Sequence, residues 1–231
     1  MNIRKLLVSL ALALSFLGLE TSNAFAATEL KTAPASWEIG ETVLAKSETL
    51  KCSLKSTNFK LAASILGASV VLSATGIECP EATISNEVVE GVDMAVASGK
   101  LVYTGVTIVE PPGCSTPSKL TTDAIKSRVD MHLENGVPTG RIFTTTEPES
   151  GTTFATVSIT GCALEGSYSV KGKTVGESTV ETGQSATDIP VAFNAATNAA
   201  GSLAIGSQPA TITGEVNREL TSGSEFRVTE K

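Results

Sequence analysis

Short runs of alternating residues, rich in threonine, most strongly limit how this chain can fold. Residues 27–231 contain 29 Thr and 22 Ser, about a quarter of that stretch. Residues 154–160 and 210–216 alternate apolar and small polar side chains, as a half-buried strand does. Residues 100–109 form the clearest strand pattern, which the Pro-Pro-Gly run at 111–113 ends. The sequence therefore predicts an all-β fold, an antiparallel sandwich or barrel-like structure with a dozen or more strands.

The first 26 residues have the three parts of a secretory signal peptide. Arg4 and Lys5 are followed by the apolar stretch 6–19, and the small residues Ala24 and Ala26 predict cleavage after Ala26. A helix over that apolar stretch would rise about 21 Å, short of the roughly 30 Å hydrocarbon core of a bilayer. We therefore expect a protein that is secreted or retained in the cell envelope, with no membrane span after signal removal.

Four cysteines remain after the predicted signal: Cys52, Cys79, Cys114 and Cys162. An even number of cysteines in an exported chain predicts two disulfides. The spacing lacks the close pairs that zinc sites use, so we expect no metal. Loop entropy does not select among the three pairings, because they differ by only about 1 kcal/mol. We favour 52–79 and 114–162, since neighbouring segments are usually neighbours in space.

The chain is divided into residues 1–26 as the signal peptide, 27–48 as a loosely ordered N-terminal segment and 49–231 as the β domain. Two packed β subdomains with a boundary near 115–150 are an alternative for the last part. Trp37 is the single anchor that we expect in the N-terminal segment, as a plug of the core rather than a platform for a ligand.

Three segments need separate interpretation. Residues 61–77 are uncharged but contain Ser, Thr and Gly, and they predict buried strands with a turn at Gly67. Residues 122–135 fit a helix by the spacing of their apolar residues but also alternate, and the strand-rich surroundings favour a strand. Residues 194–207 are rich in Ala, Gly and Asn, which indicates a loop and a weak strand.

Charge and composition exclude several functions. The net charge is −7 and no run of Lys or Arg is present, so we expect no binding to nucleic acid. His132 is the only imidazole, no Gly-x-Ser-x-Gly motif accompanies it, and the four Asp are scattered. We therefore expect no catalytic residue, cofactor or metal. A cell-surface protein or a polysaccharide is the class of partner that we expect.

Three stretches resemble a known group of proteins: residues 99–122, which include Glu110-Pro111-Pro112-Gly113-Cys114, residues 159–170 and residues 210–214. Over about 49–228 the chain is similar to uncharacterised exported Thr/Gly-rich β proteins of actinobacteria. The resemblance implies a secreted or cell-envelope β protein, and it implies no activity, ligand or catalytic residue. A weaker similarity is to pilin-like subunits, but the chain lacks a recognisable donor strand.

The leading hypothesis is a secreted or cell-envelope structural or interaction protein without catalytic activity. One alternative is a domain that binds or cleaves carbohydrate, which requires Trp37, Tyr103 or Tyr168 to share an exposed groove with a pair of Glu, such as 78/81 or 147/149. Another is a pilin-like assembling surface subunit, which requires an open sheet edge.

Overall fold

The computed structural model describes residues 30–56, 59–89 and 91–230. The predicted signal peptide and residues 27–29 lie outside the described residues. Within the described part, the chain forms twenty strands and one short helix. The prediction of an all-β fold is confirmed.

Eight antiparallel strands pair in a ring and close a barrel. Within the ring, β3 (Glu48–Leu54) and β7 (Thr83–Val89) pair through only two residue pairs, Glu48 with Ile84 and Thr49 with Thr83. In ring order, the strands are β3 (Glu48–Leu54), β7 (Thr83–Val89), β8 (Val92–Gly99), β12 (Ile125–Glu134), β13 (Val137–Pro148), β16 (Thr174–Ser178), β17 (Asp188–Phe193) and β19 (Gln208–Leu220).

Alternation along β12 decides which side chains enter the barrel. Val129 and Met131 are fully buried and face the interior, whereas Arg128 beside Val129 is exposed. The two-residue period of a strand produces this arrangement. The prediction of a strand rather than a helix at 122–135 is therefore confirmed.

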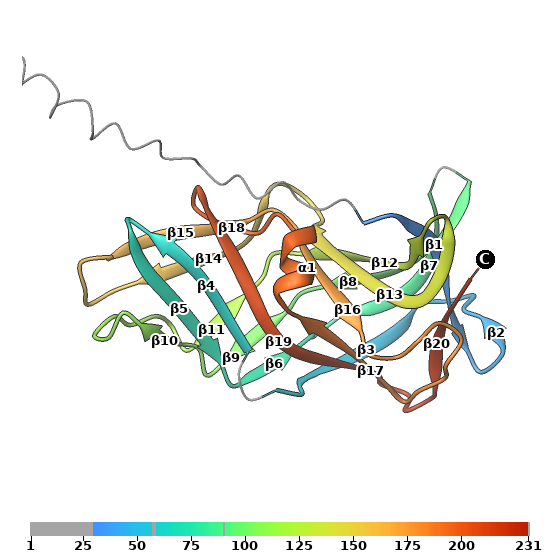
Figure 1. Cartoon of the computed structure of the whole chain (residues 1–231). Helices are drawn as coiled ribbons and strands as arrows, with labels where there is room; N and C mark the ends of the chain where they lie inside the picture. Colours follow the sequence, from blue (N-terminus) through green and yellow to red (C-terminus); the bar gives the residue numbers. More distant parts are fainter. Residues whose placement is uncertain (1–29, 57–58, 90, 231) are drawn as a thin grey trace, which may run out of the picture.

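Smaller sheets cover one end of the barrel. Their strands are β4 (Phe59–Ile65), β5 (Ala68–Ala74) and β10 (Thr107–Glu110); β14 (Thr153–Ile159), β15 (Gly166–Lys171) and β18 (Ala204–Ile205); and β6 (Gly76–Glu78), β9 (Val102–Thr104) and β11 (Lys119–Thr121). β4 and β5 form a hairpin that turns at Gly67, which has φ +81°, as the sequence predicts. Figure 1 shows β5, β10, β14 and β15 at this end of the molecule.

The N- and C-terminal strands close the opposite end. β1 (Thr32–Ile39) pairs with β12, β2 (Thr42–Val43) and β20 (Phe226–Glu230), and Figure 1 shows β1, β2 and β20 together. The side chain of Asn86 on β7 bonds the backbone N–H and C=O of Trp37 and also the C=O of Leu44. The expectation of a loosely ordered segment over 27–48 is wrong for β1, because pairing with distant strands orders it.

Two large apolar clusters fill most of the interior, and Phe143, Val175 and Ala200 form a third, small one. The barrel core surrounds Trp37, Met131 and Leu220, and the sheet core surrounds Phe59 and Phe154. Segments before and after 115–150 contribute to both clusters, so no single cut in the described chain separates them. Trp37 is fully buried, which confirms it as a plug of the core.

β19 connects the two cores and bends between them. Its residues 210–213 pair with β4, and its residues 216–220 pair with β3. Gly214 lies at the change of partner with φ +124°, a conformation that L residues rarely adopt. A Cβ atom here would lie 2.9 Å from Cα and from Cδ2 of Phe59. The bend therefore needs glycine for its backbone conformation and for the space beside Phe59.

We expect Gly214→Ala to lower the free energy of unfolding by about 2–3 kcal/mol, because strain and a backbone clash act together. Urea denaturation followed by circular dichroism measures the loss. Gly206→Ala is the matched control, since Gly206 also has positive φ (+62°) but nothing lies within 4 Å of its Cβ position. Equal losses in the two variants would contradict the role of the clash.

The one helix of the described residues lies where a loop was expected. α1 (Ala195–Ala200) is followed by β18, so the weak strand expected in 194–207 is confirmed, whereas the loop interpretation is wrong for the helix. Asn194 caps the helix: its side chain accepts hydrogen bonds from the N–H groups of Ala196 and Thr197. The Thr197 hydroxyl in turn accepts from the N–H of Asn194, which completes a capping box.

Candidate functional site

A cavity of about 160 Å³ lies where the barrel interior meets the sheet core. Barrel strands contribute Leu50, Ala97 and Val216 to its wall, and the covering sheets contribute Leu72 and Phe154. Most of the wall is apolar because these strands turn their inward positions towards it. The cavity is therefore the main candidate for a binding site in the described part of the chain.

Hydroxyl groups interrupt the apolar wall on the side of β12 and β13. Ser127, Thr144 and Thr146 line the cavity from these strands, and Thr122 lines it just before β12. The Thr122 hydroxyl accepts a hydrogen bond from the N–H of Leu101 at 2.9 Å. The Ser127 and Thr146 hydroxyls bond each other at 2.7 Å. These groups form a polar side in the mainly apolar wall of the cavity.

Arg218 is the buried charge of the cavity. It is 7% exposed, and its Nη1 donates a long hydrogen bond of 3.4 Å to the hydroxyl of Thr144. Its guanidinium carbon lies 5.7 Å from the ring centre of Trp37. Nε and Nη2 are buried and have no partner among the described residues. Burial lowers the pKa of Arg218 to about 10, so the guanidinium remains protonated at neutral pH.

Tyr103 supplies an aromatic wall. Its ring lines the cavity and stacks on the ring of Phe59, with centroids 5.4 Å apart. Burial raises the pKa of the Tyr103 hydroxyl, because the phenolate would lose its hydration. The group is therefore a neutral hydroxyl over the physiological range.

Arg218 is absent from the sequence-based predictions, although the sequence carries a signal for it. Residues 210–216 alternate, and the same alternation continues to the inward positions 218 and 220, which are both buried. Arg218 thus occupies an inward position between Val216 and Leu220. A charged residue at a core position of a strand departs from the pattern, which makes Arg218 a candidate functional residue.

The four cysteines form the two predicted disulfides. Cys52 and Cys79 are bonded with Cα atoms 5.4 Å apart, and Cys114 and Cys162 with Cα atoms 5.0 Å apart. Both sulfurs of the first pair belong to residues that line the cavity, whereas the second pair packs in the sheet core. The two bonds indicate an oxidising, extracellular environment.

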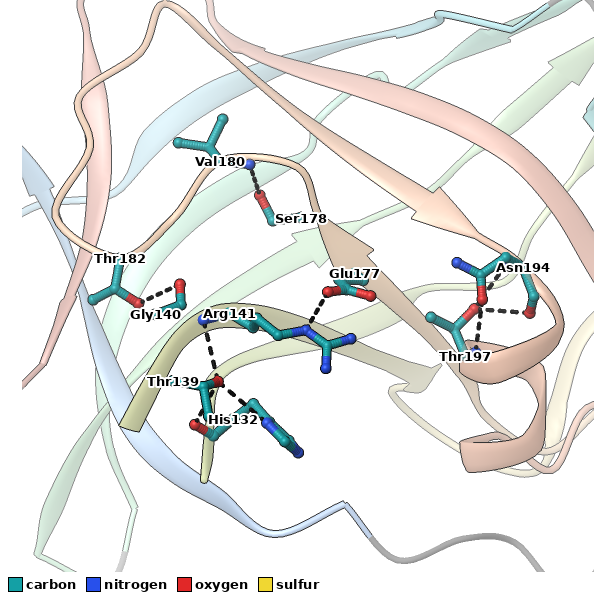
Figure 2. A network of polar contacts seen from close by, with 10 residues as sticks. All are labelled: His132, Thr139, Gly140, Arg141, Glu177, Ser178, Val180, Thr182, Asn194 and Thr197. Atoms are coloured by element: carbon teal, nitrogen blue, oxygen red, sulfur yellow. Dashed lines mark hydrogen bonds and ion pairs between the residues drawn. The ribbon is translucent and has the colours of Figure 1, made fainter. Parts of the chain in front are cut away.

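His132 lies in a polar network on the outer side of β12, β13 and β16 (Figure 2). Its Nδ1 is 3.2 Å from the hydroxyl of Thr139, which donates to the backbone C=O of His132. Arg141 in the same network binds Glu177 at 2.6 Å and lies over the ring of Phe143. His132 does not line the cavity, and these contacts join neighbouring strands.

The structure does not bring the aromatic and acidic candidates together. Trp37 is inside the barrel core, and the half-buried Tyr168 bonds the backbone C=O of Leu164 through its hydroxyl. Only Tyr103 of the three rings lines the cavity. The four glutamates of the candidate pairs are exposed and lie outside the cavity wall: Glu78, Glu81, Glu147 and Glu149.

Comparisons with protein-family models, curated proteins and solved structures found no match to this chain. Among the described residues, no cluster of three or more His, Cys, Asp or Glu side chains could hold a metal ion. The same part of the chain has no helix with the length and apolar character needed to cross a membrane. The cavity and its lining are therefore the features on which a functional proposal rests.

Proposed function

We propose that this protein is an exported interaction protein without catalytic activity, and that it binds a small apolar molecule inside its barrel. The predicted signal peptide and the resemblance to exported β proteins support the export. The two disulfides agree with an oxidising environment.

The cavity is the observation that supports binding. A cavity of about 160 Å³ leaves its apolar lining with fewer packing contacts than a filled core has. An engineered apolar cavity of about 150 Å³ binds benzene, so this volume suits a single aromatic ring or a short alkyl chain. A ligand of that size would restore the missing contacts.

The chemistry of the wall favours binding over catalysis. The ionisable side chains among the described lining residues are Lys100, Tyr103 and Arg218, and no carboxylate or imidazole from these residues faces the cavity. General acid–base catalysis most often uses His, Glu or Asp near the reacting group. The closed ring of strands likewise favours ligand binding over a pilin-like exchange of strands, since closure removes the barrel's free edges.

Titration with 1-hexanol tests this proposal. We expect binding to raise the melting temperature, because a ligand that binds only the folded state stabilises it. The fluorescence of Trp37, the single Trp of the chain, gives a second measurement. The absence of both a thermal shift and a fluorescence change at saturating 1-hexanol would contradict the proposed function.

Ala97→Leu fills the cavity from β8 and provides a variant test. We expect 1-hexanol affinity to fall at least about tenfold while thermal stability is retained, because added methylene groups occupy the ligand's volume. Ala62→Leu on β4 is the matched control, since Ala62 does not line the cavity although its neighbour Leu61 does. Undiminished affinity in Ala97→Leu would place the binding elsewhere.

A further inference from the structure

Resting on the proposed function, we propose that the ligand is a small apolar carboxylic acid, whose carboxylate is bound by Arg218 and whose apolar body fills the cavity. The class includes short alkyl and aromatic acids. Three independent features of the site lead to it: an incomplete set of hydrogen bonds, the sign of the charges in the wall and the shape of the chamber.

The hydrogen bonds of Arg218 are incomplete. Nη1 reaches the Thr144 hydroxyl, but Nε and Nη2 are buried without a partner among the described residues. A buried charge without a counter-charge is strongly unfavourable, so proteins pair such groups or bind an ion to them. The ring of Trp37 attracts the guanidinium weakly through its π electrons and supplies no hydrogen-bond acceptor in the guanidinium plane.

A carboxylate matches the free donors, which a turn of the Arg218 side chain has to present to the cavity because both nitrogens are fully buried in this structure. The guanidinium presents parallel N–H groups in one plane, and the two oxygens of a carboxylate accept from them in a bidentate pair. An alcohol or a ketone offers a single oxygen and no charge. The buried Arg218 therefore selects an acid over a neutral molecule of equal size.

The charges of the wall have one sign although the protein as a whole is acidic. The net charge of the chain is −7, yet the described lining residues include Arg218 and Lys100 and no Asp or Glu. Lys100 lines the cavity and is also exposed to solvent, so it lies where the cavity meets the surface of the protein. A lysine at the rim and an arginine in the interior both favour an anion.

The shape of the chamber limits the acid to a small one. Apolar side chains such as Leu50, Leu72 and Phe154 surround most of the volume. At about 160 Å³ it accommodates roughly one ring or a chain of about six carbons, by analogy with the benzene-sized cavity above. Long-chain fatty acids exceed this volume, so hexanoate and benzoate are suitable probes.

The test compares hexanoate with 1-hexanol on the wild-type protein and on Arg218→Met, by calorimetry and by Trp37 fluorescence. We expect the wild-type protein to bind hexanoate ~10- to 100-fold more tightly than 1-hexanol, which corresponds to a charged hydrogen-bonded pair. Arg218→Met should lose this preference and keep its affinity for 1-hexanol. Arg141→Met is the matched control: it removes the same charge from an exposed position outside the cavity and should keep the preference.

The outcomes separate this inference from the proposed function. Binding of 1-hexanol with equal affinity for hexanoate would overturn the acid ligand and leave the proposed function intact. Absence of binding by both molecules would overturn both. The affinities of the wild-type protein for hexanoate and for 1-hexanol test the inference by themselves, even if Arg218→Met fails to fold. Because Met removes an unpaired buried charge, its melting temperature should equal or exceed that of the wild-type protein.

Discussion

Replacing Trp37 with alanine is expected to lower the free energy of unfolding by about 3–5 kcal/mol, the loss typical of deleting a large buried aromatic side chain. Trp37 is fully buried, and its ring lies 5.7 Å from the ring of Phe226 on β20. Its Nε1 donates to the backbone C=O of Val96 at 3.1 Å. The side chain thus holds β1, β8 and β20 together at the closed end of the barrel.

Trp37→Phe is the control that separates packing from hydrogen bonding. The phenyl ring keeps most of the packing but leaves the Val96 carbonyl without its donor, so we expect a smaller loss of about 1–3 kcal/mol. Urea denaturation followed by far-ultraviolet circular dichroism is the measurement, because Trp37→Ala removes the only indole from the chain. A loss below about 1 kcal/mol in Trp37→Ala would show that β1 is not needed to close the barrel.

The strand content was predictable because alternation is a local property. Residues 125–134 and 210–216 alternate, and the structure places them in β12 and β19. The turn at Gly67 was predictable because it is local in sequence, and the pairing of the cysteines followed from the rule that neighbouring segments are usually neighbours in space. The closure of the barrel could not be predicted, because β3 pairs both with β19, far along the chain, and with β7 through two residue pairs that no local pattern marks.

The missed elements had different causes. β1 contains Pro34 and small residues, and its strand conformation depends on pairing with β12 and β20, far along the chain. The helix α1 did have a local signal, the capping residues Asn194 and Thr197 in a run rich in Ala, but surroundings rich in strands outweighed it. Pairing with distant strands thus determined the conformation of β1, and local capping determined that of α1.

The site was harder to predict than the fold. The wall of the cavity comes from strands that are far apart in sequence, so composition does not show which apolar residues leave a space between them. Arg218 was the exception, because the alternation of β19 marks its position as inward. A charged residue at an inward position of β19 is the one feature of the site that could have been predicted from the sequence alone.

Removing either disulfide is expected to lower the free energy of unfolding by about 3–4 kcal/mol. The sequence separations are 27 for Cys52–Cys79 and 48 for Cys114–Cys162. Loop entropy gives about 3.6 and about 4.1 kcal/mol for the two, because each bond restricts the unfolded chain. The double variants C52A/C79A and C114A/C162A, measured by urea denaturation, test this expectation. Losses below about 1 kcal/mol in both would contradict it.

The two double variants should differ in ligand binding although they lose similar stability. Cys52 and Cys79 both line the cavity, and Cys52 pairs with Arg218 across β3 and β19. C52A/C79A therefore loosens the wall beside the guanidinium and should weaken binding of 1-hexanol and of hexanoate. C114A/C162A removes a bond outside the cavity wall and should leave both affinities unchanged at temperatures where the variant is folded. Equal effects on binding would mean that the first disulfide acts on the overall fold alone and does not shape the cavity.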